Sequence, residues 1–355
     1  MNPRRGHVLW IVIAASALLV LGLLAFALVG VFFGPRPIGD GRNIESYGFD
    51  LTNLRVPREA LVASGRPRDV LLALDNPRSI AGKEIEEFNR ARGGRNKYLV
   101  STDRVVGLTI GGQSRAWPVR LLNAHEIIHD ELGGIPLAIT WSPFCDSAMV
   151  FDRRADCGVD AKGPLLSFGV SGLLLNGNLV MYDKGTNAGA GAGAVAVAGA
   201  GATHAPSLWS QLASKAVSGP AAARGAQLCS LAGVVVCPWG QWLTAHPDTS
   251  VALPDEESLR RIKAFSYERY LDSPELEWPV VPLAGGRAAA PGDPADKQSV
   301  VVTRTGPDSW SANALTSRGA HLELPIAPEG TKTIQCLWFA WRAFHGADTT
   351  LVPAN

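Results

Sequence analysis

The longest hydrophobic run of the chain lies near its N-terminus. Residues 8–33 read VLWIVIAASALLVLGLLAFALVGVFF and contain no charged side chain. At about 1.5 Å per helical residue, such a run exceeds the roughly 30 Å hydrocarbon core of a bilayer. It therefore predicts a transmembrane anchor over residues 8–33, with the lipid bilayer as partner. Arg4 and Arg5 precede the run, which favours a cytoplasmic tail at residues 1–7 and an exported remainder.

The chain changes character after this run. Residues 34–50 are polar and contain proline and glycine, so we expect a tether to an extracytoplasmic domain over residues 51–355. Within this domain, Val105–Ile110 and Ser114–Val119 are separated by Gly111-Gly112. Two strand-like runs joined by a glycine pair predict a β-hairpin.

Further short apolar runs predict more strands than helices. The predicted strands are 137–141, 148–151, 165–170, 179–182 and 299–304, and the predicted helices are 79–88 and 239–243. This distribution predicts a β-rich α+β fold, with antiparallel sheets or a partly closed barrel and short helices.

Two segments have a biased composition. Residues 187–205 read NAGAGAGAVAVAGAGATHA, which is too poor in large apolar side chains to build a core. We interpret this segment as a surface insertion. Residues 274–297 are rich in proline, glycine and alanine, and we expect an internal joint there.

The overall charge excludes one class of partner. The 355 residues carry a formal net charge of +1, and 18% of them are charged. A chain of this balance, without a basic tract or an aromatic RNA-binding motif, gives no reason to expect nucleic acid as a partner.

The N-terminal run could instead be a cleaved signal peptide, which predicts the same location for the main domain. Ala25 and Ala27 could mark the cleavage site of a signal peptide, although the apolar run continues to Phe33. Both interpretations place the main domain outside the cytoplasm, at the periplasmic or cell-surface side of the cytoplasmic (plasma) membrane. Disulfides form in such compartments.

The chain has an odd number of cysteines. They are Cys145, Cys157, Cys229, Cys237 and Cys336. At least one of the five is therefore free, bound to something or paired between chains. A local disulfide between Cys229 and Cys237, which flank a short turn-like segment, is one candidate.

Several ordered blocks together resemble one family. The blocks are RAWP at 115–118, LNAHEI at 122–127, ITWSPFCDSA at 139–148, FDR at 151–153, FGVSG at 168–172, LVMYD at 179–183, SLWSQ at 207–211 and WFAW at 338–341. They resemble the domain of unknown function 3179 family, whose members are mostly exported bacterial and archaeal proteins. The resemblance spans roughly residues 75–350, and it implies export but no settled activity.

The chain departs from the family pattern at two places. Ser142-Pro143-Phe144-Cys145 stands where the family usually has Cys-Pro-x-Cys, which excludes a dithiol pair at these two positions. The Gly/Ala segment separates Asp183-Lys184-Gly185-Thr186 from Ser207-Leu208-Trp209, which usually follow one another closely. This second departure supports a loop added to a finished fold.

The stretch His125-Glu126-Ile127-Ile128-His129 matches the H-E-x-x-H pattern of zinc hydrolases. On one helix, His125 and His129 would share a face and bind zinc, with Glu126 activating water. The third ligand is missing, because no histidine follows at the zinc-protease spacing and no glutamate lies between Glu131 and Glu256. The resembling family also commonly carries asparagine at the position of His129.

A broader hypothesis combines the two most recognisable blocks. If the strand at 137–141 returns the chain beside His125, then His125, His129, Cys145 and Asp146 could bind a transition metal such as zinc, copper or iron. Alternatively, Cys145 could act as a nucleophile with His125 and Glu126 as its partners. The bland alternative is a non-catalytic binding or scaffold domain, in which Cys145 is a small buried hydrophobe, His125 a hydrogen-bonded core residue and Asp146 a turn cap. An enzyme and a binding domain are both consistent with these residues.

Overall fold

A computed structural model describes most of the chain: residues 13, 15–22, 37–93, 97–154, 165–184, 205–262, 267–283, 294–305, 309–315, 331–345, 349 and 351–352. The chain divides into two compact units, Met1–Ile38 and Gly39–Asn355. In the first unit, residues 13 and 15–22 are helical and exposed. Most of the predicted anchor at residues 8–33 lies outside the described residues, and among those described no helix is long and apolar enough to cross a membrane.

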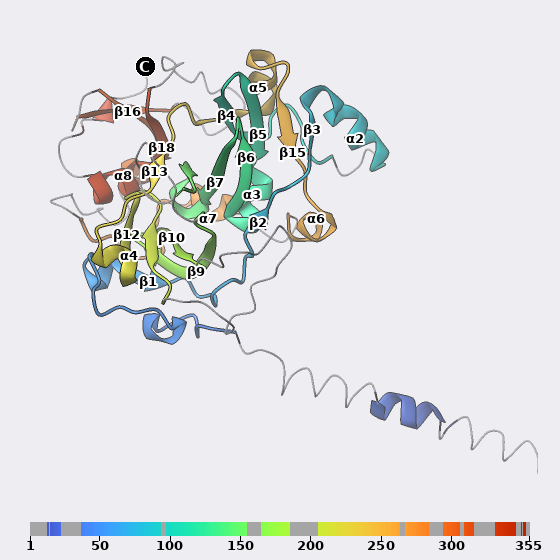
Figure 1. The fold of residues 1–355 in the computed structure, drawn as a ribbon, viewed down its shortest axis with the longest axis horizontal. Coiled ribbons are helices and arrows are strands. Elements are labelled where there is room, and N and C mark those ends of the chain that lie inside the picture. The colour runs from blue at the N-terminus through green and yellow to red at the C-terminus, as the bar shows by residue number, and fades with distance from the viewer. Residues whose placement is uncertain are drawn as a thin grey trace, which may run out of the picture. The chain divides into compact units, whose positions relative to one another are not determined.

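The second unit is built mainly from β-strands (Figure 1). The first sheet has the order β1-β9-β10-β11-β12, and all its pairs are antiparallel. The second has the order β13-β8-β7-β6-β2, in which β2 and β6 are parallel. The strands are β1 Leu61–Ala63, β9 Phe168–Leu175, β10 Asn178–Asp183, β11 Leu208–Ser210, β12 Lys215–Ser218, β13 Cys229–Ser230, β8 Ser147–Asp152, β7 Ile135–Ser142, β6 Ile127–Leu132 and β2 Leu74–Asp75.

Two more sheets complete the β-structure. The third has the order β14-β4-β5-β15-β3, with β5 and β15 parallel, and the fourth has the order β18-β16-β17-β19, with β17 and β19 parallel. Their strands are β14 Val235–Pro238, β4 Arg104–Ile110, β5 Gln113–Pro118, β15 Ser250–Ala252, β3 Ser79–Ala81, β18 Thr333–Leu337, β16 Ser299–Arg304, β17 Trp310–Ala314 and β19 Leu351–Val352.

The described helices are short. The α-helices are α2 Ile85–Ala91, α3 Val119–His125, α4 Gly219–Ala223, α5 Trp239–Ala245, α6 Glu256–Ile262, α7 Glu268–Asp272 and α8 Trp338–His345. The 3-10 helices are η1 Ile44–Tyr47, η2 Arg58–Ala60, η3 Gly82–Glu84, η4 Pro143–Cys145 and η5 Pro294–Lys297. The fold is therefore a β-rich α+β fold, as predicted.

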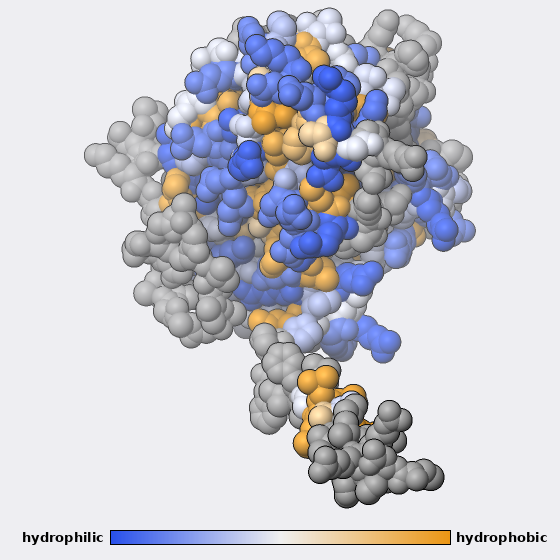
Figure 2. Space-filling model, turned by 90° about the vertical axis from the view of Figure 1, so that its right-hand side faces the viewer, coloured by the Kyte–Doolittle hydropathy of each residue, from blue (hydrophilic) through white to orange (hydrophobic). Residues whose placement is uncertain are grey.

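The second sheet is buried on both faces. Along β7 and β8, side chains alternate between two cores, because successive residues of a strand point to opposite faces. Ala138 and Phe151 belong to the core shared with the first sheet, whereas Ile139 and Val150 belong to the core shared with the third. The core side chains face inward, and hydrophilic residues cover most of the described surface in the view of Figure 2.

Four of the described strands run directly into α-helices. The pairs are β5 with α3, β12 with α4, β14 with α5, and β18 with α8. Pro118 and Pro238 end their strands with φ near −59°, an angle that fits both an extended residue and the entry to a helix. Helix α3, which follows β5 in this way, ends at His125, and β6 begins two residues later at Ile127.

The local patterns predicted most strands correctly. The hairpin is β4–β5, joined through Gly111 and Gly112, which both have positive φ. The predicted helix at 239–243 is α5, and the predicted strand at 299–304 is β16. The predicted helix at 79–88 begins as strand β3 and becomes helical only at Gly82.

Two expectations about organisation need correction. No barrel forms among the described strands, because each of the four sheets is open and ends in edge strands. Residues 39–50 are not a tether, because Tyr47 is fully buried and its hydroxyl donates to the carbonyl of Arg66 at 2.6 Å. Both flanks of residues 274–297 belong to one compact unit, and the internal joint expected there stays a prediction. The Gly/Ala segment at 187–204 lies outside the described residues.

Candidate functional site

The H-E-x-x-H stretch is split between a helix and a strand. Helix α3 ends at His125, and β6 begins at Ile127. Glu126 between them has φ 57° and ψ −25°, a left-handed conformation that is uncommon for a residue other than glycine. Its N–H donates to the carbonyl of Leu122 at 2.6 Å, and its carbonyl accepts from the N–H of Trp141 at 2.8 Å. The two histidines therefore do not share a helix face.

Both ring nitrogens of His125 are used inside the fold. Nδ1 lies 2.6 Å from the carbonyl oxygen of Leu72, and Nε2 lies 2.8 Å from Oγ of Ser258 on α6. Because a carbonyl can only accept, Nδ1 carries the proton. Burial lowers the pKa of His125, so the ring is neutral and Nε2 accepts from the serine hydroxyl. No lone pair of His125 is left for a metal ion or a substrate proton.

His129 is likewise a buried, neutral histidine. On β6, its Nδ1–H donates to the carboxylate of Asp75 at 2.5 Å, and its Nε2 accepts from the N–H of Phe168 at 3.1 Å. Burial lowers the pKa of His129 to about 4, against the smaller opposing effect of the Asp75 hydrogen bond. His129 thus holds β6 to β2 and to the start of β9.

Glu126 differs from the two histidines of this stretch, because its side chain has no partner inside the described fold. Its side chain is partly buried, and no residue in the described part of the chain offers its carboxylate a hydrogen bond or an ion pair. Burial raises the pKa of Glu126 to about 8. Tyr267 lies close enough for the Glu126 charge to help raise the pKa of the phenol, after the larger effect of burial. A carboxyl that titrates near neutral pH is suited to proton transfer.

Cys145 is fully buried on the short helix η4. Its sulfur makes a weak hydrogen bond to the carbonyl oxygen of Asn176, at 3.9 Å. Burial raises the pKa of the Cys145 thiol to about 12, against smaller lowering effects from the side chains of Asn178 and Ser142. The thiol is therefore protonated at neutral pH, whereas the thiolate is the nucleophile and the metal ligand.

Asp146 follows Cys145 in a left-handed conformation, with φ 46° and ψ 39°. Its carboxylate accepts two hydrogen bonds from Arg104, at 2.8 and 3.1 Å, and is completely buried. The side-chain oxygen of Gln335 accepts from the same guanidinium at 2.8 Å. Asp146 thus joins the β7–β8 turn to β4 and, through Arg104, to β18.

The predicted metal ligands do not come together. His125 lies against Leu72 and Ser258, His129 against Asp75, and Asp146 against Arg104. Across the described ranges, no group of three or more histidine, cysteine, aspartate or glutamate side chains has a geometry that could hold a metal ion. The arrangement expected of a zinc hydrolase is therefore not formed by these residues.

The cysteines follow a pattern that we did not predict. Cys145, Cys237 and Cys336 are buried and free, whereas Cys229 is disulfide-bonded. The predicted disulfide between Cys229 and Cys237 is therefore wrong, because Cys237 pairs along β14 with β4 and keeps its thiol. Cys157 lies outside the described residues.

Sequence reasoning missed a buried polar network between the first and second sheets. Gln211 is at its centre: its oxygen accepts from Ser147 Oγ and Asn178 Nδ2, both at 2.8 Å, and its nitrogen donates to Thr140 Oγ1 at 3.1 Å. All four side chains are fully buried. Such a satisfied network fixes how sheets pack. Its signal was present in the SPFCDSA, LNGN and SLWSQ stretches, whose polar residues lie inside apolar runs.

Phe144 on η4 anchors a distant segment to the same turn. Its ring packs edge-on against Tyr267, Tyr270 and Trp278, with centroids 5.2, 5.2 and 4.5 Å away. The side chain of Asn176 also exchanges two hydrogen bonds with the backbone of Val281, at 2.7 and 2.8 Å. These contacts hold residues 267–283 beside η4 and beside the turn at Asn176 between β9 and β10.

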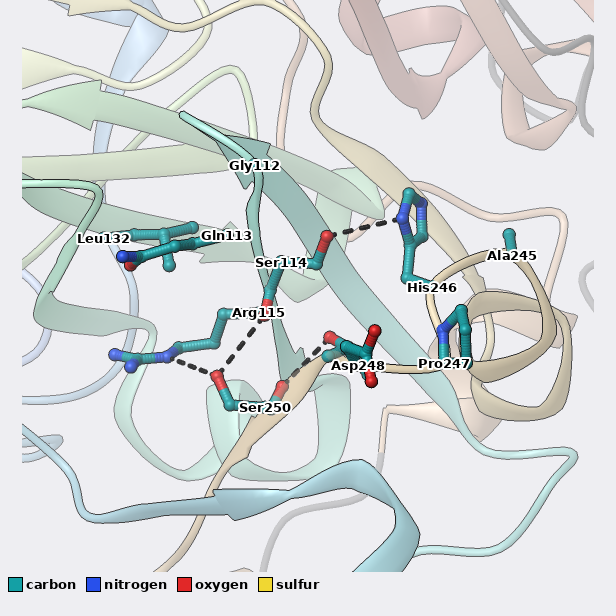
Figure 3. A pocket seen from close by; sticks show the side chains of 11 residues that line it. Gly112, Gln113, Ser114, Arg115, Leu132, Ala245, His246, Pro247, Asp248 and Ser250 are labelled. Atoms are coloured by element: carbon teal, nitrogen blue, oxygen red, sulfur yellow. Dashed lines mark hydrogen bonds between the residues drawn. The ribbon is translucent and has the colours of Figure 1, made fainter.

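A polar pocket lies elsewhere, at one edge of the third sheet. It has a volume of about 470 Å³ and is formed by the β4–β5 turn, the start of β5 and the loop between α5 and β15. Figure 3 shows Arg115 on one side of β5, and Ser114 with His246 on the other. None of the residues predicted for a site lines this pocket.

The comparisons with known proteins find one family. Residues 71–190 match the model of a family described as protein of unknown function (DUF3179), and this stretch contains His125, Glu126, His129, Cys145 and Asp146. No curated protein and no solved structure matches the chain. The blocks at 207–211 and 338–341 lie beyond the match, so their part of the resemblance stays a prediction. Over residues 71–190, the chain is thus shown to carry the DUF3179 family pattern that its motifs predicted.

Proposed function

We propose that the protein is a membrane-anchored, extracytoplasmic binding domain in which most motif residues hold the fold. One observation carries this proposal: both ring nitrogens of His125 and the buried sulfur of Cys145 have separate partners inside the fold. A catalytic or metal-binding pair would need these atoms directed to a common point. The metal- or thiol-dependent site around His125 and Cys145, with zinc, copper or iron, ranks below the binding domain for this reason, and the zinc hydrolase ranks lowest.

The proposed location has two supports. The uncharged run at residues 8–33 is long enough to anchor the chain in a bilayer, with residues 1–7 on the cytoplasmic side. A disulfide, such as the one that Cys229 forms, is typical of proteins in oxidising compartments. Extraction of cell membranes with alkaline carbonate should leave the chain in the membrane pellet. Release into the supernatant would contradict the anchor.

The experiment that tests the binding-domain proposal combines metal analysis with thiol labelling. We expect no stoichiometric metal in the purified chain, and alkylation of Cys145 only after unfolding, because the native thiol is buried and protonated. The variant pair His125→Ala and Cys145→Ser should lose stability and change no metal content. Stoichiometric metal that disappears in these variants, or rapid native labelling of Cys145, would favour a metal or thiol site instead.

Glu126 supports a second candidate function, acid–base chemistry. Its carboxyl has no partner among the described residues, is partly accessible and is close enough to Tyr267 to influence the pKa of the phenol. With a pKa near 8 it would be protonated at neutral pH and could donate a proton to a bound molecule. A measured pKa near the ordinary 4.5 would remove this candidate and leave the binding domain untouched.

A further inference from the structure

Two of the free cysteines are next to residues that share one guanidinium group. Arg104 donates to the carboxylate of Asp146 at 2.8 and 3.1 Å and to the side-chain oxygen of Gln335 at 2.8 Å. Asp146 directly follows Cys145, and Gln335 directly precedes Cys336. Arg104 therefore joins the backbone beside one thiol, at the end of η4, to the backbone beside the other, on β18.

The side chains of Cys145 and Cys336 also lie in the same part of the core. Both are fully buried members of one hydrophobic cluster, whereas the free Cys237 belongs to another. The sulfur of Cys145 and the ring of Phe339, three residues after Cys336, both lie within 4.0 Å of the place where a side chain on Gly177 would begin. Burial is the main cause of the raised pKa of Cys336, and Cys145 is close enough to raise it further. These observations make Cys145 and Cys336 a pair.

Both thiols are unreactive while the fold is closed. Burial raises the pKa of Cys145 to about 12 and the pKa of Cys336 well above its usual value. The thiolate is the form that attacks a disulfide, so thiol–disulfide exchange begins only when local opening admits water to one of the thiols. Oxidation of the pair therefore depends on how this part of the core opens.

A peripheral segment lies against the elements that carry the two thiols. Asn176, whose carbonyl accepts from the Cys145 thiol, exchanges two hydrogen bonds with the backbone of Val281, at 2.7 and 2.8 Å. The N–H of Leu283 donates to a carbonyl of α8 at 2.7 Å. None of residues 276–282 between these points is fully buried. Such a segment can open locally without separating the core strands, and this opening gives a small reagent access.

We infer that Cys145 and Cys336 are a dithiol that is oxidised to an intramolecular disulfide, which locks the β7–β8 turn to β18. The oxidant is a disulfide, either small or carried by another protein, and the proposed location is a compartment in which such oxidants occur. The inference goes beyond the proposed binding function, which neither requires nor excludes this bond.

The exchange has two steps. The thiolate of one cysteine attacks a sulfur of the oxidant, which forms a mixed disulfide and releases the other sulfur of the oxidant as a thiol. The thiolate of the second cysteine then attacks the sulfur of the first, and the remaining sulfur of the oxidant leaves as a second thiol. The protein loses two electrons and two protons, and the oxidant gains them.

Mass spectrometry of the full chain in detergent tests this pairing. The purified chain is incubated with oxidised glutathione, without prior reduction, and its remaining thiols are then blocked with N-ethylmaleimide in denaturant. After tryptic digestion without reductant, we expect most molecules to contain peptide 121–153, which carries Cys145, joined to peptide 333–342, which carries Cys336. Dithiothreitol should separate the two peptides.

The matched control is Cys237→Ser, which removes another buried free thiol and should keep the linked peptides. Cys336→Ser should abolish the link and leave Cys145 as an N-ethylmaleimide adduct. Recovery of both Cys145 and Cys336 as adducts from the oxidised parent chain would overturn the inference. A link from Cys336 to peptide 225–260, which carries Cys237, would also overturn it.

Failure of this inference is separable from failure of the proposed function. Metal content does not depend on the disulfide, and native labelling of Cys145 is slow whether its thiol is buried or oxidised. Stoichiometric metal would contradict the binding domain and leave the linked peptides to be judged on their own.

Discussion

Two turns of this molecule use the same backbone device for different ends. Each ends a short helix with an acidic residue in the left-handed conformation: Glu126 after α3 and Asp146 after η4. Asp146 is completely buried and accepts two hydrogen bonds from Arg104, whereas Glu126 is partly accessible and has no partner among the described residues. An unusual backbone conformation in a family motif is therefore not by itself a sign of chemistry. The two turns differ in whether the acidic side chain is paired: Asp146 is paired and has a structural role, whereas Glu126 is unpaired and can exchange a proton.

The largest expected effect comes from breaking the paired turn. Asp146→Ala would leave the Arg104 guanidinium buried without its counter-charge, and we expect a loss of about 3–5 kcal/mol in the free energy of unfolding. Urea denaturation monitored by tryptophan fluorescence measures this loss. Glu257→Ala is the control, because Glu257 forms an exposed pair with Arg261 at 2.6 Å that should contribute less than about 0.5 kcal/mol. Equal losses in the two variants would contradict the structural role of Asp146.

A somewhat smaller effect follows from the neutral histidine beside the Glu126 turn. Burial lowers the pKa of His129 from 6.5 to about 4 in the folded protein, so the unfolded chain binds a proton more readily. The stability due to neutral His129 is present above pH 6.5 and is lost as the pH falls towards 4. The loss amounts to about 3 kcal/mol. His129→Gln should remove this part of the acid dependence, and an unchanged pH profile would argue against a buried neutral ring.

The unpaired turn should show the smallest effect and the opposite pH dependence. The pKa of Glu126 is about 8 when folded, against an ordinary 4.5, so the folded protein holds the proton more tightly. The free energy of unfolding should therefore fall as the pH rises from 4.5 to 8. The full shift would correspond to about 4–5 kcal/mol, which we discount because the side chain is partly accessible to solvent. Glu126→Gln should therefore be more stable than the parent chain by about 1–3 kcal/mol at pH 8 and nearly equal to it at pH 4.5. Exposed Glu131→Gln is the control and should show no such difference.

The local structure could be predicted from the sequence, but the partners of the motif residues could not. The β4–β5 hairpin was predictable because an apolar run, a glycine pair and a second run are all local signals. The split of the H-E-x-x-H stretch was not, because the left-handed turn at Glu126 depends on the backbone hydrogen bond from Trp141. The burial of Tyr47 in a segment expected to be a tether likewise depends on the distant carbonyl of Arg66. Contacts that far along the chain leave no periodic signal.

For the candidate site, too, the residues were predictable from the sequence but their partners were not. The residues themselves were named from the sequence, since His125, Glu126, Cys145 and Asp146 lie in the blocks that resemble the family. Whether each side chain has a hydrogen-bond partner depends on residues far along the chain. Ser258 is such a partner for His125, and Arg104 for Asp146. The pocket beside Arg115 had no sequence signal, because it is formed by the meeting of β5 with the loop before β15.

One measurement tests the contrast between the two turns most directly: the titration of Glu126 by carboxyl-carbon NMR. The Glu126→Gln variant, which lacks the signal, assigns the resonance. Because burial disfavours the charged form of this unpaired carboxyl, Glu126 should titrate near pH 8. A midpoint near 4.5 would mean that Glu126 is solvated or paired in solution, and the distinction between an occupied and an available turn would be lost.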